Sequence, residues 1–221
     1  MKRKGNYYWL LAVIPLFFVV WFFVNKNEQK PLRILPYYGR KKIVQQGDTN
    51  YHTVKPFFLT NQYNEKVTEM DVKGKIYVTD FFFTTCQSIC PIMSNQLERV
   101  YQYFLNNSDV MLLSHTVAPE EDSVNVLMDY AKLHHVTNKQ WLFLTGEKKH
   151  LYDLARQGYL LNAEEGSGGD DDFIHTQNFA LVDKERHLRG FYDGTDSADV
   201  SRLITDMTIL LEEYAYKQKH R

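Results

Sequence analysis

The stretch "IYVTDFFFTTCQSICPIM" (residues 76–93) contains a predicted strand, the start of a predicted helix and both cysteines of the chain. Its first part, residues 76–83, is rich in β-branched and aromatic side chains and is typical of a strand buried in a central sheet. Pro91 is compatible with the first turn of a helix and not with its interior. A helix is therefore expected to start at Cys90, with Cys86 in the loop before it. Open α/β sheets bind ligands after the carboxyl ends of their strands, so this position favours chemistry.

Further strands and helices alternate after this unit. In chain order the sequence predicts a helix at 93–105, a strand at 109–117, a helix at 123–134, a strand at 140–146, a short helix at 147–157, a hairpin at 179–194 that turns at 183–185, and an amphipathic helix at 196–216. Strands that alternate with helices indicate an α/β fold whose sheet is covered on both faces. The order of elements resembles a thioredoxin-like central sheet flanked by helices.

An apolar segment precedes this domain. Residues 7–24, "YYWLLAVIPLFFVVWFFV", carry no charge, and as a helix they would span about 27 Å, roughly the hydrocarbon thickness of a bilayer. Basic residues 2–4 predict that the N-terminus stays in the cytoplasm and that the rest lies outside. A cleaved signal peptide fits less well because the run ends in bulky side chains without a small-residue cleavage site. We therefore expect a single N-terminal transmembrane anchor (1–25), a tether (26–50) and a soluble domain (51–221).

The composition supports a folded domain and argues against one class of partner. Hydrophobic residues make up 44% of the chain and aromatic residues 14%, which is enough for a buried core. Beyond residue 30 the chain carries five more acidic than basic side chains. Nucleic-acid binding needs clustered Lys and Arg, so we expect no nucleic-acid partner.

The two cysteines could be a structural disulfide, a redox couple or two ligands of a metal. A disulfide across so short a loop would remove little entropy from the unfolded chain, and a domain of this size needs no such staple. The N–H groups and the dipole at a helix start would stabilise thiolates at Cys86 and Cys90. Two thiolates with three residues between them can converge on one soft ion, either Cu(I) or Zn(II). The same pair could also cycle between dithiol and disulfide.

Two ligands seldom make a tight metal site, so a third is expected among the eight histidines. Most of them are accounted for by a helix, a strand or a peripheral position: His52, His115, His134, His135, His150, His187 and His220. His175 instead follows the acidic, glycine-rich stretch 164–172 and precedes a strand. It therefore belongs to a loop at the edge of the sheet, either as the third ligand or as a solvated residue.

Three segments resemble motifs of one family. "DFFFTTCQSICPIM" resembles the F-x-x-T-x-C-x-x-x-C-P signature of the Sco/SenC family, the membrane-anchored, thioredoxin-like copper proteins of cytochrome oxidase assembly. "HTVAPEEDSVNVLMDYAKLH" with "WLFLTG" is similar to its V-D-P-E-x-D segment, helix and W-x-x-L-T-G strand, and "DFIHTQNFALVDKERHLRGFYDG" to its histidine-bearing strand and hairpin. The resemblance covers about residues 51–211. It implies that Cys86, Cys90 and His175 bind copper, as Cu(I) or Cu(II).

One position departs from the family pattern. Ala118 stands where the family usually has an Asp that is linked to copper handling or partner contact. Glu120, Glu121 and Asp122 follow closely and could substitute for it. The acidic stretch 164–172 could attract cations, although such a stretch is more often a solvated loop.

The resemblance implies a copper metallochaperone. It would receive copper from an unidentified donor and deliver it to the cytochrome c oxidase subunit that holds the binuclear copper centre. The alternative is a thiol–disulfide oxidoreductase that keeps the cysteines of that centre reduced, and a domain without chemistry is the third reading. The C-x-x-x-C spacing, in place of C-x-x-C with a cis-proline, favours metal binding. We expect a monomer with one membrane anchor and an extracytoplasmic (periplasmic) domain, in a bacterial inner membrane rather than a mitochondrial one.

Overall fold

The computed structural model describes residues 33–43, 49–161 and 176–220, together with Trp21. The compact unit that contains the sheet is Ile34–Arg221. The predicted anchor, residues 7–24, lies outside the described residues except for Trp21. Within the described part of the chain, no helix has both the length and the apolar character needed to span a bilayer.

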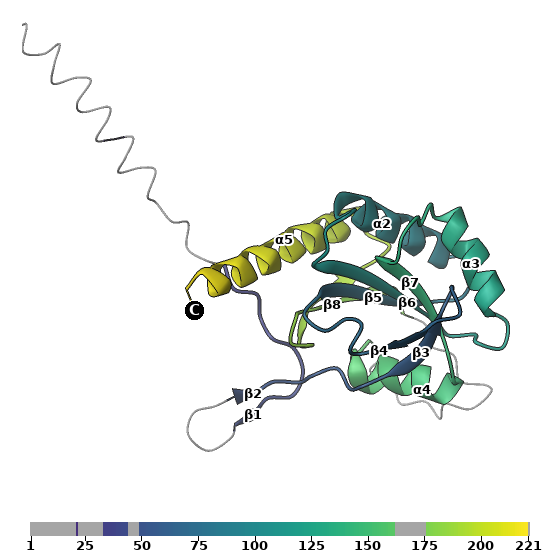
Figure 1. Ribbon diagram of the computed structural model, residues 1–221, viewed down its shortest axis with the longest axis horizontal. Helices are drawn as coiled ribbons and strands as arrows, with labels where there is room; N and C mark the ends of the chain where they lie inside the picture. Colours follow the sequence, from purple (N-terminus) through teal and green to yellow (C-terminus); the bar gives the residue numbers. More distant parts are fainter. Residues whose placement is uncertain (1–20, 22–32, 44–48, 162–175, 221) are drawn as a thin grey trace, which may run out of the picture. The chain divides into compact units, whose positions relative to one another are not determined.

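A seven-stranded mixed sheet forms the centre of this unit (Figure 1). The strands are β3 (Phe58–Asn61), β4 (Lys66–Thr68), β5 (Ile76–Phe82), β6 (Val110–Thr116), β7 (Trp141–Thr145), β8 (Asn178–Val182) and β9 (Leu188–Asp193), in the order β4-β3-β7-β6-β5-β8-β9. A separate pair consists of β1 (Lys42–Ile43) and β2 (Thr49–Asn50). β5 pairs with β6 in parallel and with β8 in antiparallel orientation. All seven residues of β5 are buried, which confirms the predicted central strand.

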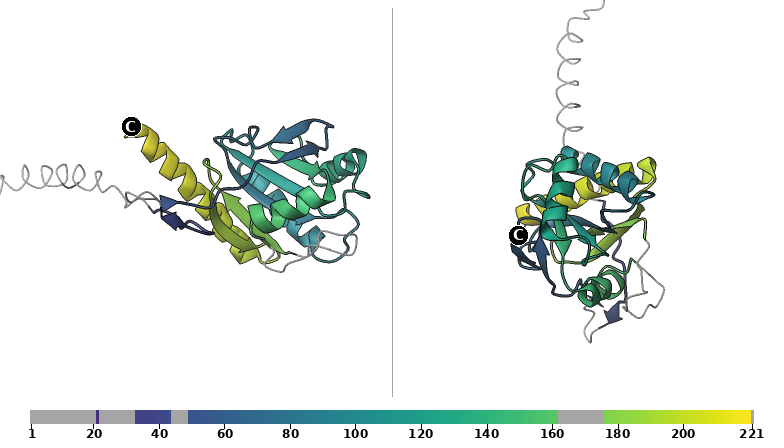
Figure 2. Two further views of the ribbon diagram at one scale, coloured as in Figure 1. Left: turned by 90° about the horizontal axis from the view of Figure 1, so that it is seen from below. Right: turned by 90° about the vertical axis from the view of Figure 1, so that its right-hand side faces the viewer.

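Helices cover both faces of the sheet (Figures 1 and 2). They are α2 (Cys90–Tyr103), α3 (Val124–Leu133), α4 (Lys148–Asp153), the single π-helical turn η2 (Leu154–Gly158) and α5 (Ser197–Lys219). α2, α3 and α5 lie on one face, and α4 lies on the other. The helix predicted at 147–157 is therefore divided into α4 and η2, while the other predicted helices are present with slightly shifted ends.

Each face of the sheet has its own hydrophobic core, and β5 contributes to both. Val78 and Phe82 pack with residues of α2, α3 and α5, whereas Tyr77 and Phe81 pack with residues of α4 and η2. This division follows from the period of two in a strand, which points successive side chains to opposite faces. Side chains on both faces of the sheet therefore pack against the end of β5.

A buried arginine joins the start of the domain to its end. Arg189, on β9, is buried; it donates hydrogen bonds to Asp183 Oδ2 at 2.9 Å and to Glu213 Oε2 at 3.1 Å. It also donates to the carbonyl oxygens of Leu35 at 2.8 Å and Pro36 at 3.2 Å. A buried guanidinium needs several acceptors to offset its lost hydration. These contacts and the burial of Leu35 make the chain around residue 35 part of the domain's packing.

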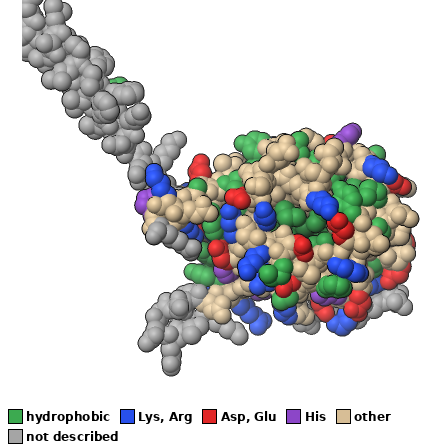
Figure 3. Space-filling model, viewed as in Figure 1, with side chains coloured by type: hydrophobic (Ala, Val, Ile, Leu, Met, Phe, Trp, Pro, Cys, Tyr) green, Lys and Arg blue, Asp and Glu red, His purple; other side chains and the backbone are tan. Residues whose placement is uncertain are grey.

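The surface of the domain is mixed in charge. On the face shown in Figure 3, basic and acidic side chains are interspersed with apolar ones over the described residues. Ile92 and Tyr103 of α2 and Leu133 of α3 are among the apolar side chains that reach solvent.

Candidate metal centre

A tight turn and a helix start bring the two cysteines together. The turn Phe83–Cys86 follows β5 and is closed by the backbone bond from Cys86 N–H to the Phe83 carbonyl, at 3.2 Å. α2 begins at Cys90 with Pro91 in its first turn. The structure therefore places both cysteines as the sequence predicts, one in the loop and one at the helix start.

Both cysteines are free thiols at one small cavity. Cys86 is 9% exposed and Cys90 is 4% exposed. The cavity has a volume of about 260 Å³. It is lined by Phe81, Phe82, Phe83, Cys86, Ser88, Ile89, Cys90, Val117 and Thr176. The lining is mostly apolar, and an apolar shell limits the access of water to a site and lowers its dielectric constant.

The two thiols differ in acidity. Burial raises the pKa of Cys86, but hydrogen bonds from Cys90 and Ser88 outweigh it and lower that pKa to about 7. Ser88 Oγ lies 3.6 Å from the Cys86 sulfur. Burial and the interaction with Cys86 raise the pKa of Cys90 to about 12. At neutral pH Cys86 is therefore partly a thiolate, the form that binds metals and attacks disulfides, while Cys90 holds its proton.

A buried carboxyl group, that of Asp80, lies on the face of β5 that packs with the two cysteines. Asp80 is 1% exposed, and neither of its oxygens has a hydrogen bond of normal geometry within the described residues. Burial raises the pKa of Asp80 to about 7, and Ser114 only partly opposes the rise. A charged Asp80 would also help to keep Cys90 protonated. This residue was not among the predicted site residues, although a single Asp within an apolar strand was a usable signal.

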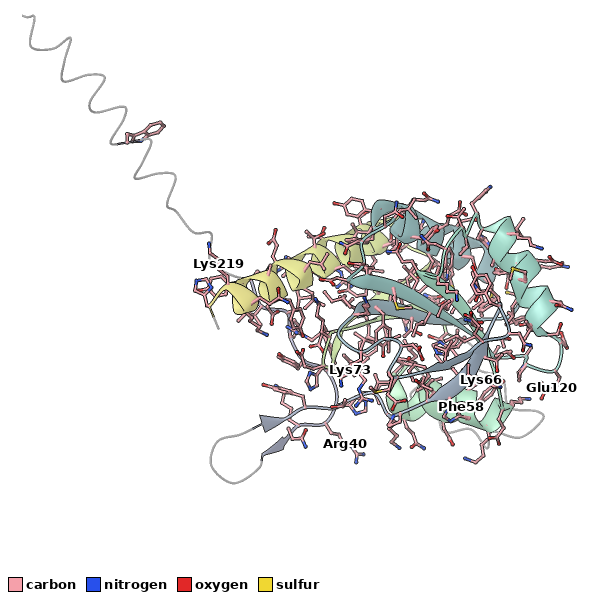
Figure 4. All side chains as sticks on the ribbon, viewed as in Figure 1. Arg40, Phe58, Lys66, Lys73, Glu120 and Lys219 are labelled. Carbon is pink, nitrogen blue, oxygen red and sulfur yellow. The ribbon has the colours of Figure 1, made fainter. Side chains whose placement is uncertain are left out.

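The three acidic residues near Ala118 have different environments. Glu120 and Glu121 are exposed, and Glu120 lies at the right-hand edge of the domain in Figure 4. Asp122 is fully buried and accepts hydrogen bonds from Thr84, which belongs to the Phe83–Cys86 turn, called the cysteine turn below. The three therefore differ in burial and in partners, and the substitution of any of them for the family's Asp at position 118 stays a prediction.

The third predicted ligand, His175, lies outside the described residues, as does the acidic stretch 164–172. Thr176, the next residue along the chain, lines the cavity with both cysteines. His115 has the core role that its strand position indicated, with Nδ1 at 3.0 Å from Thr79 Oγ1.

Another group of side chains of the types that can bind a metal lies at the turn between β8 and β9. Ligand atoms of Asp183, Glu185 and His187 lie within 4.8 Å of one another. Asp183 is already paired with the buried Arg189, and Glu185 accepts a hydrogen bond from Tyr214. These partners give the group a structural role.

Comparison with known proteins gives one family and several relatives. The SCO1/SenC family model matches residues 45–211. The SCO1 protein homolog of Bacillus subtilis (strain 168) is 29% identical over 160 residues, which cover 72% of this chain and 82% of the relative.

Several solved structures are similar, among them the following two. BsSco, a member of the Sco family of cytochrome c oxidase assembly proteins with a disulfide switch, is 27% identical with a TM-score of 0.61, over 72% of this chain and 93% of that one. Arabidopsis thaliana ScoI with copper bound is 26% identical with a TM-score of 0.58, over 73% of this chain and 99% of that one. These similarities confirm the predicted α/β, thioredoxin-like architecture.

The raised pKa of Asp80 predicts a specific pH dependence of stability. In the folded chain the pKa of Asp80 is about 7, above its ordinary value of 3.8. The contribution of this group to the free energy of unfolding is therefore fully present at low pH and is lost as the pH rises through 7. Asp80→Asn removes this loss. Urea unfolding should show that the free energy of unfolding of the variant, relative to that of the wild type, rises by about 1–3 kcal/mol between pH 5 and pH 8. Equal pH slopes for both proteins would contradict this assignment.

Proposed function

The chain belongs to the SCO1/SenC family, and from that premise we propose that it is a copper-binding metallochaperone. Cys86, Cys90 and His175 hold the copper ion, and the recipient is the cytochrome c oxidase subunit with the binuclear copper centre. Copper bound to ScoI of Arabidopsis thaliana supports the choice of metal. The membership of BsSco in a family of cytochrome c oxidase assembly proteins supports the choice of recipient.

The observation that carries the proposal is the pair of free thiols at one apolar cavity. Soft thiolate ligands favour Cu(I) over harder ions. Cys86 is partly ionised at neutral pH and offers the first thiolate. Cys90 still holds its proton, so metal capture must release it, and copper affinity should rise with pH.

His175 completes the site in this proposal. A neutral imidazole is a ligand for both Cu(I) and Cu(II), whereas two thiolates alone do not bind the two oxidation states equally well. The position of Thr176 in the cavity lining supports this assignment, because it is the next residue along the chain. Transfer to the recipient proceeds by ligand exchange, in which the recipient's thiolates displace these three side chains in turn.

The proposal includes the predicted location. Residues 7–24 anchor the chain in the membrane, and the basic residues before them keep the N-terminus in the cytoplasm. The domain then works as a monomer on the extracytoplasmic side, in a bacterial inner membrane, where copper and the oxidase subunit meet it.

A second function, thiol–disulfide exchange, is favoured by the unequal acidity of the thiols. The Cys86 thiolate would attack a partner disulfide, and Cys90 would resolve the mixed disulfide. The pair would end as a disulfide, and the partner would gain two electrons and two protons. The disulfide switch of BsSco, at 27% identity, supports this alternative.

Removal of either thiol tests the copper site. We expect the reduced wild type to bind one copper ion per chain, and Cys86→Ser or Cys90→Ser to lose tight binding, because a serine hydroxyl is too hard and too weakly acidic for Cu(I). Copper content and competition with a Cu(I) chelator measure the effect. Ser108→Ala, at an exposed serine that does not line the cavity, is the control. Near-normal affinity in a serine variant, or a preference for zinc, would reject the site.

Replacement of His175 separates the two functions. A copper site needs a third ligand, whereas disulfide exchange needs only the cysteines. His175→Ala should weaken Cu(II) binding more than Cu(I) binding, because two thiolates still hold Cu(I), while oxidation of the dithiol continues. The control is His135→Ala, an exposed histidine paired with Glu98. If His175→Ala binds both copper states normally and supports full oxidase assembly, the disulfide-exchange function takes precedence.

A further inference from the structure

The loop between β6 and α3 contacts the cysteine turn through Asp122. Its own turn is closed by the bonds from Glu121 N–H and Asp122 N–H to the Ala118 carbonyl, at 3.1 and 2.9 Å. α3 begins two residues after Asp122. This arrangement carries the Asp122 side chain into the interior, where it is 0% exposed.

Three donors from two different segments converge on the Asp122 carboxyl group. The Thr84 backbone N–H lies 3.3 Å from each oxygen, and the Thr84 hydroxyl donates a short bond to Oδ1. The Thr116 hydroxyl, at the end of β6, donates a short bond to Oδ2. A buried carboxylate is costly without such donors, and hydrogen bonds to a charged acceptor are the stronger kind. Asp122 is thus tied both to the sheet and to the cysteine turn.

Thr84 is the second residue of the turn that ends at Cys86. The backbone bond that closes this turn is 3.2 Å long, and the neighbouring bond from Val117 N–H to the Phe82 carbonyl holds only the end of β5. The bonds between Thr84 and Asp122 therefore add a side-chain restraint to the backbone bond that closes the turn. The adjacent Glu121 provides no comparable restraint, since it is exposed and its Oε2 lies 3.5 Å from Thr85 Oγ1.

From this geometry we propose that Asp122 is a positioning residue of the metal centre. It contacts no metal; it holds the Phe83–Cys86 turn so that the Cys86 sulfur stays beside Cys90 at the cavity. This inference rests on the proposed function, because it assigns Asp122 to the copper site. Residues that orient metal ligands typically change affinity by about 10–100-fold when they are replaced.

Paired variants of the full-length chain in detergent test the proposal. Asp122→Asn replaces an acceptor oxygen by an amide donor, and Thr84→Val removes one hydroxyl donor. Thr84→Ser keeps that hydroxyl, and Glu121→Gln changes the neighbouring exposed carboxylate. Two quantities are measured at a temperature where each protein is folded. One is Cu(I) affinity by chelator competition. The other is the rate at which iodoacetamide alkylates Cys86 in the reduced, metal-free protein, followed by mass spectrometry.

We expect Asp122→Asn and Thr84→Val to lower Cu(I) affinity by about 10-fold or more. Both should also change the alkylation rate of Cys86, while Thr84→Ser and Glu121→Gln stay within about twofold of the wild type in both measurements. A lower melting temperature of Asp122→Asn with unchanged affinity and alkylation would overturn the proposal, because the residue would then only stabilise the fold.

Two further outcomes are decisive. If Asp122→Asn does not fold, the Thr84→Val and Thr84→Ser pair decides, and equal behaviour of the two overturns the proposal. If the wild type itself binds no copper, the proposed function fails. The alkylation rates then still show whether Asp122 positions Cys86.

Discussion

The pairing of β5 with a strand on each side is the constraint on which the site depends. β6 and β8 hold its backbone, and the two hydrophobic cores hold its side chains. The last residue of β5 is therefore fixed, and the chain must turn at once into the residues that lead to α2. Cys86 and Cys90 meet because this connection is short and because Pro91 is compatible with a helix start. The chemistry follows from the position, since both sulfurs meet a small apolar cavity rather than open water.

The interior around the cysteines contains two buried carboxyl groups with opposite environments. Asp122 has donors for both oxygens, so its burial is compensated and it can act as a fixed point. Asp80 lacks such donors within the described residues, and burial raises its pKa. A buried group of this kind costs stability when charged, and natural proteins tend to keep such costs near functional sites. The unequal pKa values of Cys86 and Cys90 arise in the same low-dielectric region.

Patterns of neighbouring residues predicted those parts of the fold that depend on residues close together in the sequence. The apolar run of β5, the helix start at Cys90 and the placement of both cysteines depend on residues within one short stretch. The different environments of Glu120, Glu121 and Asp122 could not be predicted, because they depend on Thr84, which is 38 residues from Asp122. The same holds for Arg189, whose carbonyl partners at Leu35 and Pro36 are more than 150 residues away. The division of the predicted 147–157 helix into α4 and η2 also has no signal in the apolar pattern. The predictions for His175 and for the anchor stay predictions, since those residues lie outside the described part of the chain.

The central claim is that two thiolates and one imidazole form a single copper site. X-ray absorption at the copper edge of the Cu(I)-loaded, full-length chain tests it most directly, because the spectrum reports the ligand atoms themselves. The account predicts sulfur from Cys86 and Cys90 together with the scattering of one imidazole ring, which disappears in His175→Ala. A ligand shell of oxygen and nitrogen without sulfur, or an imidazole signal that persists in His175→Ala, would contradict it.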